Sequence, residues 1–394
     1  MARKTTSQDH PKTLFTESFP SPNETFYSGD TPNPYLSAFA QAHVQAHPFS
    51  TSVDRYDVVA FDEPLMTSKA TAIYNMHSYH QGKKPHDAIR QYIRHCTAPG
   101  DLVLDPFSGS GGTALAALLE GRKAIAIDRS PGATFIASNY CRPIAPSVLR
   151  LAFEELLAEA NKEVGWLYET RCDHCDGKAV LNYSVISQVF RCQKCLQDVP
   201  LFDCEKAVTT NAAGKQKQVS ACPHCHARGH VEEISTRQPR IGLKTVLVNY
   251  TCLGQCTPSR GERRHNDPDP IKLKYFRDVD LETLDRITSG KIPYYYPRTL
   301  MIEGRETRVK RDLTAHGVTY VCDLFTKRNL WVLSFLYQIT NERFDKATRN
   351  TLLFGLNSIL LAMSRLQGYV EDPRFPNQLM RGTYYLPPVS REYN

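Results

Sequence analysis

The sequence contains no apolar run that approaches the roughly 18 residues needed to span a membrane, and no apolar stretch follows Met1. These absences predict a protein without a membrane span or a secretory signal. No heptad, collagen-like or longer repeat is present, which excludes coiled coils and repeat arrays. The sequence has only slightly fewer acidic residues than basic ones, and its net charge is +7. This charge is compatible with a polyanion partner but does not require one.

The 394 residues, of which 41% are hydrophobic, are enough for roughly two or three globular domains. Residues 1–50 are polar and rich in proline, serine, threonine and histidine, so we expect a flexible arm. Residues 51–165 carry strand and helix patterns, and residues 166–270 hold close cysteine pairs. Residues 271–394 are expected to form a mixed, helix-rich return segment.

Strand and helix signals alternate between residues 88 and 139. The pattern predicts helices over 88–95, 114–120 and 133–139, and strands over 102–105 and 123–128. This order is typical of a parallel sheet built from right-handed crossovers, so the predicted fold class is α/β. Further helices are predicted over 148–163, 326–340 and 346–366, with Thr326 as the N-cap of the second.

A glycine-rich loop from Asp105 to Ala114 joins the first predicted strand to a helix. Ligands of open α/β sheets bind at this place, and glycines let the backbone approach them closely. The spacing Gly109-x-Gly111-x-x-Ala114 loosely fits a dinucleotide such as NAD, and S-adenosylmethionine competes with it. The Asp105 carboxylate would repel a pyrophosphate, whereas it favours a ligand with an ammonium and a sulfonium. Asp128 ends the next strand and can accept hydrogen bonds from the ribose of either ligand.

Three segments together resemble the amino-methylating DNA methyltransferases, which modify adenine N6 or cytosine N4. They are Asn75-Met76-His77-Ser78-Tyr79-His80-Gln81-Gly82-Lys83-Lys84-Pro85, the stretch 99–111 with Asp105-Pro106-Phe107-Ser108-Gly109-Ser110-Gly111, and the stretch 121–128 ending in Asp128. The resemblance covers about residues 70–145. It implies a Rossmann-like S-adenosylmethionine-dependent methyltransferase sheet, interrupted here by a small β zinc-ribbon insert domain. One departure is Gly112, where the family usually has threonine or valine.

The resemblance also implies a cofactor, a substrate and a set of site residues. The cofactor is S-adenosylmethionine, the substrate is double-stranded DNA, and the expected setting is a cytoplasmic restriction–modification system. Lys84 is a candidate for the carboxylate of the cofactor's methionine part, or else a solvated surface lysine. The expected cofactor-binding residues are Lys84, Asp105, Phe107, Gly109, Gly111 and Asp128.

The family's catalytic signature, Asp/Asn/Ser-Pro-Pro followed by an aromatic residue, is missing from these 394 residues. In the family, its polar oxygen and a proline carbonyl accept the N–H bonds of the flipped base, and the aromatic side chain stacks on it. The nearest strings, Pro32-Asn33-Pro34-Tyr35 and Leu386-Pro387-Pro388-Val389, each lack part of it. We therefore assign no catalytic residue and expect this chain alone to be inactive.

Two explanations for the missing motif are open. The catalytic half follows Asn394 in a longer enzyme, or the chain is a natural half that pairs with a second polypeptide carrying that motif. The alternative function is a non-catalytic, zinc-containing DNA-recognition subunit of a modification system. An NAD-dependent enzyme is disfavoured by Asp105 and by the Lys84-Pro85 segment.

Twelve cysteines without a secretory signal indicate metal ligands rather than disulfides, and eight of them form four close pairs. The first two pairs are separated by sixteen residues, which is typical of a zinc ribbon whose short hairpin gathers four thiolates. The last two pairs form the second expected set, although pairing across the sets is also open. The pairs are Cys172 and Cys175, Cys192 and Cys195, Cys222 and Cys225, and Cys252 and Cys256.

The cysteine-rich segment has a structural and a recognition interpretation. Small β units without a large core need a metal to fold. In amino-methyltransferases of this motif order, however, the target-recognition domain occupies the same place, and we favour DNA contact. Residues available for phosphate contacts are Lys215, Lys217, Arg228, Arg237, Arg240, Lys244, Arg260, Arg263 and Arg264.

Two further features lie in the last third of the chain. The aromatic string 291–298 is predicted to be an edge segment packed on the core rather than a stacking surface for bases. Lys327 and Arg328 oppose the dipole in the first turn of their helix, which suggests a nearby anion such as a DNA phosphate.

Overall fold

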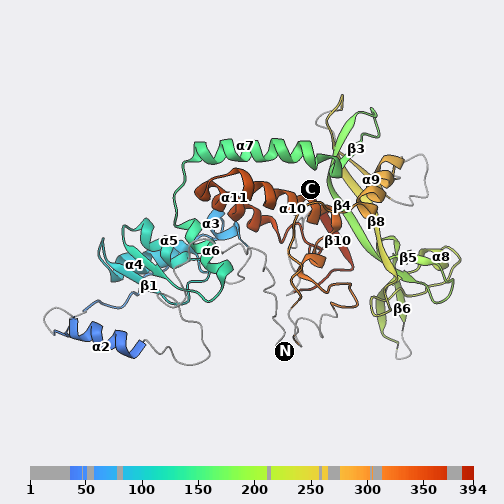
Figure 1. Cartoon of the computed structure of the whole chain (residues 1–394). Coiled ribbons are helices and arrows are strands. Elements are labelled where there is room, and N and C mark those ends of the chain that lie inside the picture. Colours follow the sequence, from blue (N-terminus) through green and yellow to red (C-terminus); the bar gives the residue numbers. More distant parts are fainter. Residues whose placement is uncertain are drawn as a thin grey trace, which may run out of the picture. The chain divides into compact units, whose positions relative to one another are not determined.

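In a computed structural model, the chain forms two compact units (Figure 1), Met1–Asn75 with Tyr79–Arg142, and Met76–Ser78 with Pro143–Asn394. The structure describes residues 36–46, 48–50, 57–77, 83–210, 214–256, 260–264, 276–301, 304, 313–370 and 384–394. The expected boundaries at residues 165 and 270 both fall within the second unit.

The first unit is built around two parallel strands, with Leu102 opposite Lys123 and Asp105 opposite Ala126. The predicted order of strand, helix, strand and helix is confirmed. An eleven-residue helix, α2, lies inside the segment expected to be an arm. The elements in the described part of this unit are α2 (Leu36–Ala46), α3 (Ala72–Asn75), α4 (His86–Cys96), β1 (Leu102–Asp105), α5 (Gly112–Leu119), β2 (Lys123–Ala126) and α6 (Pro131–Tyr140).

The β1–β2 pair has one covered and one open face. A small core joins α4 and α5 to the covered face, through Ile93, Ala116 and Ala117 packed against Val103 and Ala124. Parallel sheets generally bury both faces. The other face instead carries four aliphatic side chains that are 45–60% exposed: Leu102, Leu104, Ile125 and Ile127.

A six-stranded antiparallel sheet forms the centre of the second unit. Its long strand β4 (Lys178–Arg191) lies between β10 (Val389–Tyr393) and β8 (Gly242–Cys252), and β9 (Arg260–Arg264) borders β8. The short strands β3 (Glu169–Arg171) and β5 (Asp198–Pro200) pair with opposite ends of β4. β4 is continuous over 14 residues because it contains no proline or glycine that would end it.

Four helices pack beside this sheet around the largest apolar cluster, which includes Leu167, Tyr250, Ile287 and Phe335. Figure 1 shows α7 running alongside α10 and α11. The helices predicted over 148–163 and 326–340 are confirmed, and the Thr326 side chain caps the latter by accepting from the Asn329 N–H at 3.2 Å. The helices are α7 (Pro146–Glu163), α9 (Asp278–Ser289), α10 (Lys327–Arg343) and α11 (Lys346–Ile359).

The predicted helix over 346–366 is correct at its start but ends at Ile359. Beyond it, Ser364 forms a bridge with Phe325, and the Arg365 N–H donates to the Leu324 carbonyl at 2.7 Å. Backbone groups committed to these partners are not available to continue a helix. The aromatic string packs on the core as predicted, since the Tyr294 ring lies 5.2 Å from that of Phe335.

A smaller part of the second unit has its own core. Phe190, Val199 and Ile234 are buried there together with three cysteines. Its elements are β5, the hairpin β6 (Glu205–Thr210) and β7 (Gln216–Ala221), and the short helix α8 (Pro223–His226). Among the described residues of the second unit, 3-10 turns occur at Gly165–Tyr168, Leu201–Asp203 and Val321–Leu324.

The proposed anion contact of Arg328 is wrong. Its guanidinium is 4% exposed and forms a buried ion pair with Glu392 on β10, whose side chain is 5% exposed. It also donates to the Ser184 hydroxyl at 3.1 Å. Lys327, on the other side of the same turn, is exposed and donates to the Thr288 carbonyl at 2.6 Å. Within the described ranges, no helix is both long enough and apolar enough to cross a bilayer.

Candidate cofactor loop and candidate metal centres

The glycine loop lies at the carboxyl end of β1 and turns sharply before α5. Gly109 and Gly111 have φ angles of 51° and 82°, the left-handed region in which a side chain is strained. The loop is tied to the end of β2 by the Ser108 N–H, which donates to the Ile127 carbonyl at 2.9 Å. Two strand ends and one loop therefore meet at the same edge of the sheet.

Two carboxylates lie at this edge. One Asp105 oxygen accepts from the Phe107 N–H at 3.1 Å. The two Asp128 oxygens accept from the N–H groups of Gly109 and Ser130, each at 2.8 Å. Each carboxylate oxygen has a second lone pair, so Asp128 can hold the loop and still accept a ligand hydroxyl. The loop-holding role of Asp128 was not part of the sequence prediction.

The other predicted residues of this site are also in the first unit. Phe107 is 89% exposed at the outer side of the loop. Lys84 has an exposed side chain, and its carbonyl oxygen lies 3.9 Å from a Cβ position built on Gly112 at the start of α5. Lys83, which the sequence did not single out, donates to the Tyr74 carbonyl at 3.1 Å. Burial lowers the pKa of Lys83.

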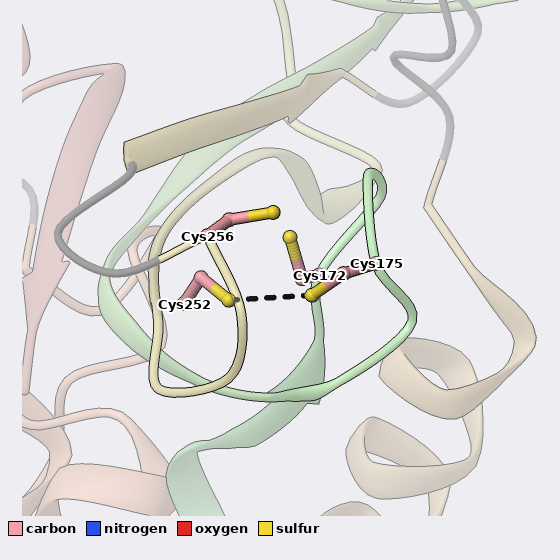
Figure 2. A group of neighbouring side chains, drawn as sticks. All are labelled: Cys172, Cys175, Cys252 and Cys256. Carbon is pink, nitrogen blue, oxygen red and sulfur yellow. Dashed lines mark hydrogen bonds between the residues drawn. The ribbon is translucent and has the colours of Figure 1, made fainter.

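The eight predicted cysteines are brought together in two groups of four. In each group the four sulfur atoms lie within 4.8 Å of one another. Figure 2 shows the first group, with its sulfur atoms directed toward a common centre. The groups are Cys172, Cys175, Cys252 and Cys256, called site A, and Cys192, Cys195, Cys222 and Cys225, called site B.

The sulfur spacing fits a tetrahedral metal rather than disulfides. Zinc–thiolate bonds of about 2.3 Å place the sulfurs of a tetrahedron about 3.8 Å apart. In site A, the Cys175 and Cys252 sulfurs are 3.6 Å apart. In site B, two sulfur pairs are each 3.7 Å apart: Cys192 with Cys225, and Cys195 with Cys222. Four thiols with this spacing are a donor set that fits Zn²⁺.

The pairing favoured by the spacing, Cys172 and Cys175 with Cys192 and Cys195, is wrong. These two pairs stand at opposite ends of β4, because fourteen of the sixteen intervening residues form one strand and not a hairpin. Strand β8 runs back along β4, with Ala179 opposite Cys252 and Val189 opposite Gly242. Cys252 and Cys256 therefore lie beside the first pair, Cys172 and Cys175, at one end of β4. The second and third pairs lie together at the other end.

One thiol in each site is already favoured as a thiolate. The backbone N–H of Gly177 lowers the pKa of Cys175 to about 6, and that of Gln197 lowers the pKa of Cys195 to about 7. Burial raises the pKa of Cys225 to about 12, and the neighbouring Cys175 raises that of Cys256 to about 12. A bound metal favours the thiolate form of all four.

The two knuckles that begin the sites have the same backbone geometry. Asp176 and Leu196 each follow the second cysteine of the knuckle, and their φ angles are 52° and 60°. Their N–H groups donate to the carbonyls of Cys172 and Cys192, each at 3.0 Å. A left-handed backbone costs a residue with a side chain about 1–2 kcal/mol.

Leu196→Gly should therefore stabilise site B. Leu196 is 66% exposed, so little packing is lost, and relief of the backbone strain should raise the free energy of unfolding by about 1 kcal/mol. Urea unfolding of the zinc-loaded chain, followed by zinc release, measures the change. Asp176→Gly is the contrast, because Asp176 also accepts from Arg277 at 2.5 Å and its gain should be smaller. Equal or reversed effects of the two changes would contradict this account.

The basic residues of the segment differ in their surroundings. Lys217 forms an ion pair with Glu233 at 2.8 Å, and Arg240 lies next to Arg365. His226 contacts Glu205 at 2.5 Å and stays outside site B. The side chains of Arg260, Arg263 and Arg264 lie outside the part of the chain that the structure describes.

Comparison with known proteins finds a similarity to a protein family in the first unit. Residues 28–139 match the family model described as DNA methylase, a range that includes the glycine loop, Asp128 and α2. This match identifies a region similar to DNA methylases within the first unit. The protein named "Putative methylase YubD", from Escherichia coli strain K12, is 42% identical to it over 55 residues. That alignment covers 14% of this chain and 24% of the length of YubD. No solved structure matches the chain.

Proposed function

We propose that this chain is the cofactor- and DNA-binding part of an S-adenosylmethionine-dependent DNA methyltransferase. Its target is the exocyclic amino group of adenine or cytosine. The observation that carries the proposal is the loop between β1 and α5, where Asp105 and Asp128 stand at neighbouring strand ends within the DNA methylase match. S-adenosylmethionine supplies the methyl group when it is bound.

The residues around the loop fit that cofactor. The Asp105 carboxylate attracts its cationic ammonium and sulfonium groups, and Asp128 has acceptor capacity left for the ribose hydroxyls. The exposed Phe107 ring offers an apolar surface to the adenine. The backbone of Lys84 lies beside the start of α5 and its side chain is exposed, so we assign its ammonium to the methionine carboxylate.

Sites A and B hold zinc in this proposal, one ion at each end of the β4–β8 ribbon. The ions stabilise a sheet that presents basic side chains to DNA, as expected of a target-recognition domain. The donor chemistry supports zinc because four thiolates in a tetrahedron are the ligand set of structural zinc sites.

The groups that activate the base come from outside these 394 residues, either from a further segment of the same protein or from a second polypeptide. Two observations support this part of the proposal. The sequence lacks the catalytic signature, and the β1–β2 sheet has an open face with Leu104 and Ile125 at its centre. The missing signature equally favours the second candidate, a DNA-recognition subunit that binds the cofactor without using it.

Calorimetric titration with S-adenosylmethionine, and separately with NAD, tests the cofactor. We expect S-adenosylmethionine to bind and NAD not to bind. Asp105→Ala should weaken S-adenosylmethionine binding at least about tenfold, through loss of an opposite charge at close range. Asp62→Ala is the control, because it removes an exposed carboxylate beside Phe61, which packs against Tyr92 and His95 of α4 rather than against the loop. Binding of NAD, or equal binding by both variants, would reject the proposed cofactor.

A methylation assay separates the two candidates. The isolated chain should transfer no methyl group from labelled S-adenosylmethionine to duplex DNA. Addition of a family member that carries the Pro-Pro signature but has its own Asp-Pro-Phe loop inactivated should restore transfer if this chain supplies the cofactor. Cofactor binding without any such complementation would favour the recognition subunit.

A further inference from the structure

A pocket of about 310 Å³ lies in the second unit, between the sheet and the beginning of α10. One wall is a row of side chains from three adjacent strands, since Ser390, Ile186 and Thr245 occupy paired positions on β10, β4 and β8. The opposite wall is formed by the residues that open α10 and by Arg365. The lining residues are Ile186, Leu243, Thr245, Phe325, Thr326, Lys327, Arg365 and Ser390.

The charge of this lining has one sign. Lys327 and Arg365 are cations, the other six residues are neutral, and none is a carboxylate. The first N–H groups of α10 have no partner within the helix and add positive potential on the same side. The hydroxyl of Thr245 adds a donor on the sheet side, whereas the Ser390 hydroxyl donates to the Ile186 carbonyl at 3.5 Å.

Arg365 is a mostly buried cation that donates its hydrogen bonds to backbone groups. Its guanidinium donates to the carbonyls of Asp323 at 2.8 Å and His316 at 3.1 Å. The Asp323 carboxylate, the acidic group that acts on Arg365, is itself engaged by the N–H groups of Thr319 and Tyr320, each at 2.8 Å. These neutral carbonyls accept from two of the five N–H donors of Arg365 and do not neutralise its charge.

A second arginine lies beside Arg365 and raises the cost of that charge. One terminal nitrogen of Arg240 is buried without a hydrogen-bond partner, and the other lies 3.6 Å from a Cβ position on Gly317. Burial and the charge of Arg240 lower the pKa of Arg365 to about 10. Two like charges held together in this way favour an anion between or beside them.

We propose that this pocket binds a phosphate group of a nucleotide, held by Arg365 and Lys327, with the attached sugar and base against Phe325, Ile186 and Leu243. Planar guanidinium groups bind phosphate through two parallel hydrogen bonds. A volume of about 310 Å³ is at the lower end of that of small-molecule pockets, roughly 300–1,000 Å³. It exceeds what a bare phosphate needs, and the apolar side chains match the carbon atoms of a nucleoside.

The source of the phosphate rests on the proposed function: in a DNA methyltransferase it is the backbone of the DNA. The sequence suggested a phosphate contact by Lys327 and Arg328, and in this proposal Lys327 and Arg365 make that contact instead. Arg328 is engaged by Glu392, and Arg365, from a segment 37 positions later, takes its place beside Lys327. Free mononucleotides share the same chemistry and are tested in parallel.

The test is fluorescence anisotropy of a labelled duplex with the zinc-loaded full chain, over a series of salt concentrations. Lys327→Gln should weaken DNA binding about five- to tenfold and reduce the slope of log affinity against log salt by roughly 0.9, the value of one phosphate contact. Leu243→Glu should weaken it at least as much, because it places a carboxylate in the pocket. Leu243 is 48% exposed, so this variant should fold.

Leu151→Glu is the matched control. It adds the same charge at a side chain of α7 that is 67% exposed and does not line the pocket. DNA affinity that is equal in all three variants, together with no binding of dAMP or inorganic phosphate by the wild-type chain, overturns the proposal. Binding of dAMP that Lys327→Gln removes, with unchanged DNA affinity, supports the phosphate site and identifies a mononucleotide as its source.

Titration of the same variants with S-adenosylmethionine keeps the two proposals apart. The pocket lies in the second unit and Asp105 in the first, so Lys327→Gln should leave cofactor binding unchanged. Loss of DNA binding with intact cofactor binding supports the pocket. Absence of cofactor binding in the wild-type chain rejects the proposed function but leaves the phosphate site to be judged on the DNA and dAMP titrations alone.

Discussion

Cys252→Ser should unfold most of the second unit, at a cost of more than about 4 kcal/mol, which is the range associated with loss of a structural metal. Cys252 and Cys172 are fully buried members of the largest apolar cluster, together with Leu167 and Tyr250. Site A thus does two things: it joins the start of β4 to the end of β8, and it fills one end of that core. Loss of the metal would leave unpaired thiols inside an apolar cluster.

The same substitution at site B should have a local effect. Cys222 is also fully buried, but its cluster is a separate small core with Phe190, Val199 and Ile234. Cys222→Ser should therefore release β5, the β6–β7 hairpin and α8 while α7 and α10 stay folded. The two variants are matched in chemistry and burial, so the difference between them reports the position of the site in the fold.

Zinc analysis and hydrogen exchange measure both effects. The wild-type chain should contain two zinc ions, and each variant one, according to the two groups of four cysteines. Backbone exchange in Cys222→Ser should rise over about residues 192–234, and in Cys252→Ser also over α7 and α10. Wild-type zinc content in either variant, or identical exchange patterns in both, would show that the cysteines do not form two independent metal sites.

Local signals were sufficient to predict the elements around the cofactor loop. β1 and β2 are short apolar runs that end in Asp105 and just before Asp128, and glycine ends the helix between them. Thr326 caps α10 as predicted, because an N-cap depends on residues only three positions apart. Periodicity and caps are properties of a few consecutive residues, and the sequence contains all of them.

The pairing of the cysteines could not be read in the same way, because it depends on the path of two strands. A spacing of sixteen residues suits a hairpin, but residues 178–191 contain no glycine or proline to form its turn. That absence was a usable signal for one long strand. The return of Cys252 to Cys172 is set by the pairing of β4 with β8, residues about 70 positions apart.

The burial of charged side chains also could not be predicted from the sequence. Arg328 was expected to face an anion, yet its partner is Glu392, 64 residues later. Arg240 was only one of nine candidate phosphate contacts in the sequence, and Arg365 was not among them. Their combined effect becomes visible only when the fold places Arg240 beside Arg365, which lines the pocket. Adjacent lysine and arginine residues look alike in a sequence, whereas helix geometry points one to the core and the other to solvent.

Gly111→Ala should disrupt the cofactor loop and abolish S-adenosylmethionine binding. A Cβ atom at Gly111 would lie 2.5 Å from the Cβ of Ala137 and 2.7 Å from its Cα, so the loop would clash with the backbone of α6. The φ angle of 82° adds the strain of a left-handed residue. We expect the free energy of unfolding to fall by about 1–2 kcal/mol through backbone strain, and by about 3 kcal/mol or more through the clash with α6.

Gly121→Ala separates the effect of backbone strain from the effect of the steric clash. Gly121 also has a positive φ, 71°, but nothing lies within 4 Å of a Cβ built on it, so this variant should lose only the backbone part. Hydrogen exchange of β1, α5 and α6 measures stability, and calorimetry measures cofactor binding. Because helix α6 carries the backbone that meets the loop, exchange should rise in α6 for Gly111→Ala and remain near the wild-type value for Gly121→Ala. Equal losses in the two variants would mean that glycine is required at residue 111 for its φ angle alone and that close packing against α6 does not hold the loop.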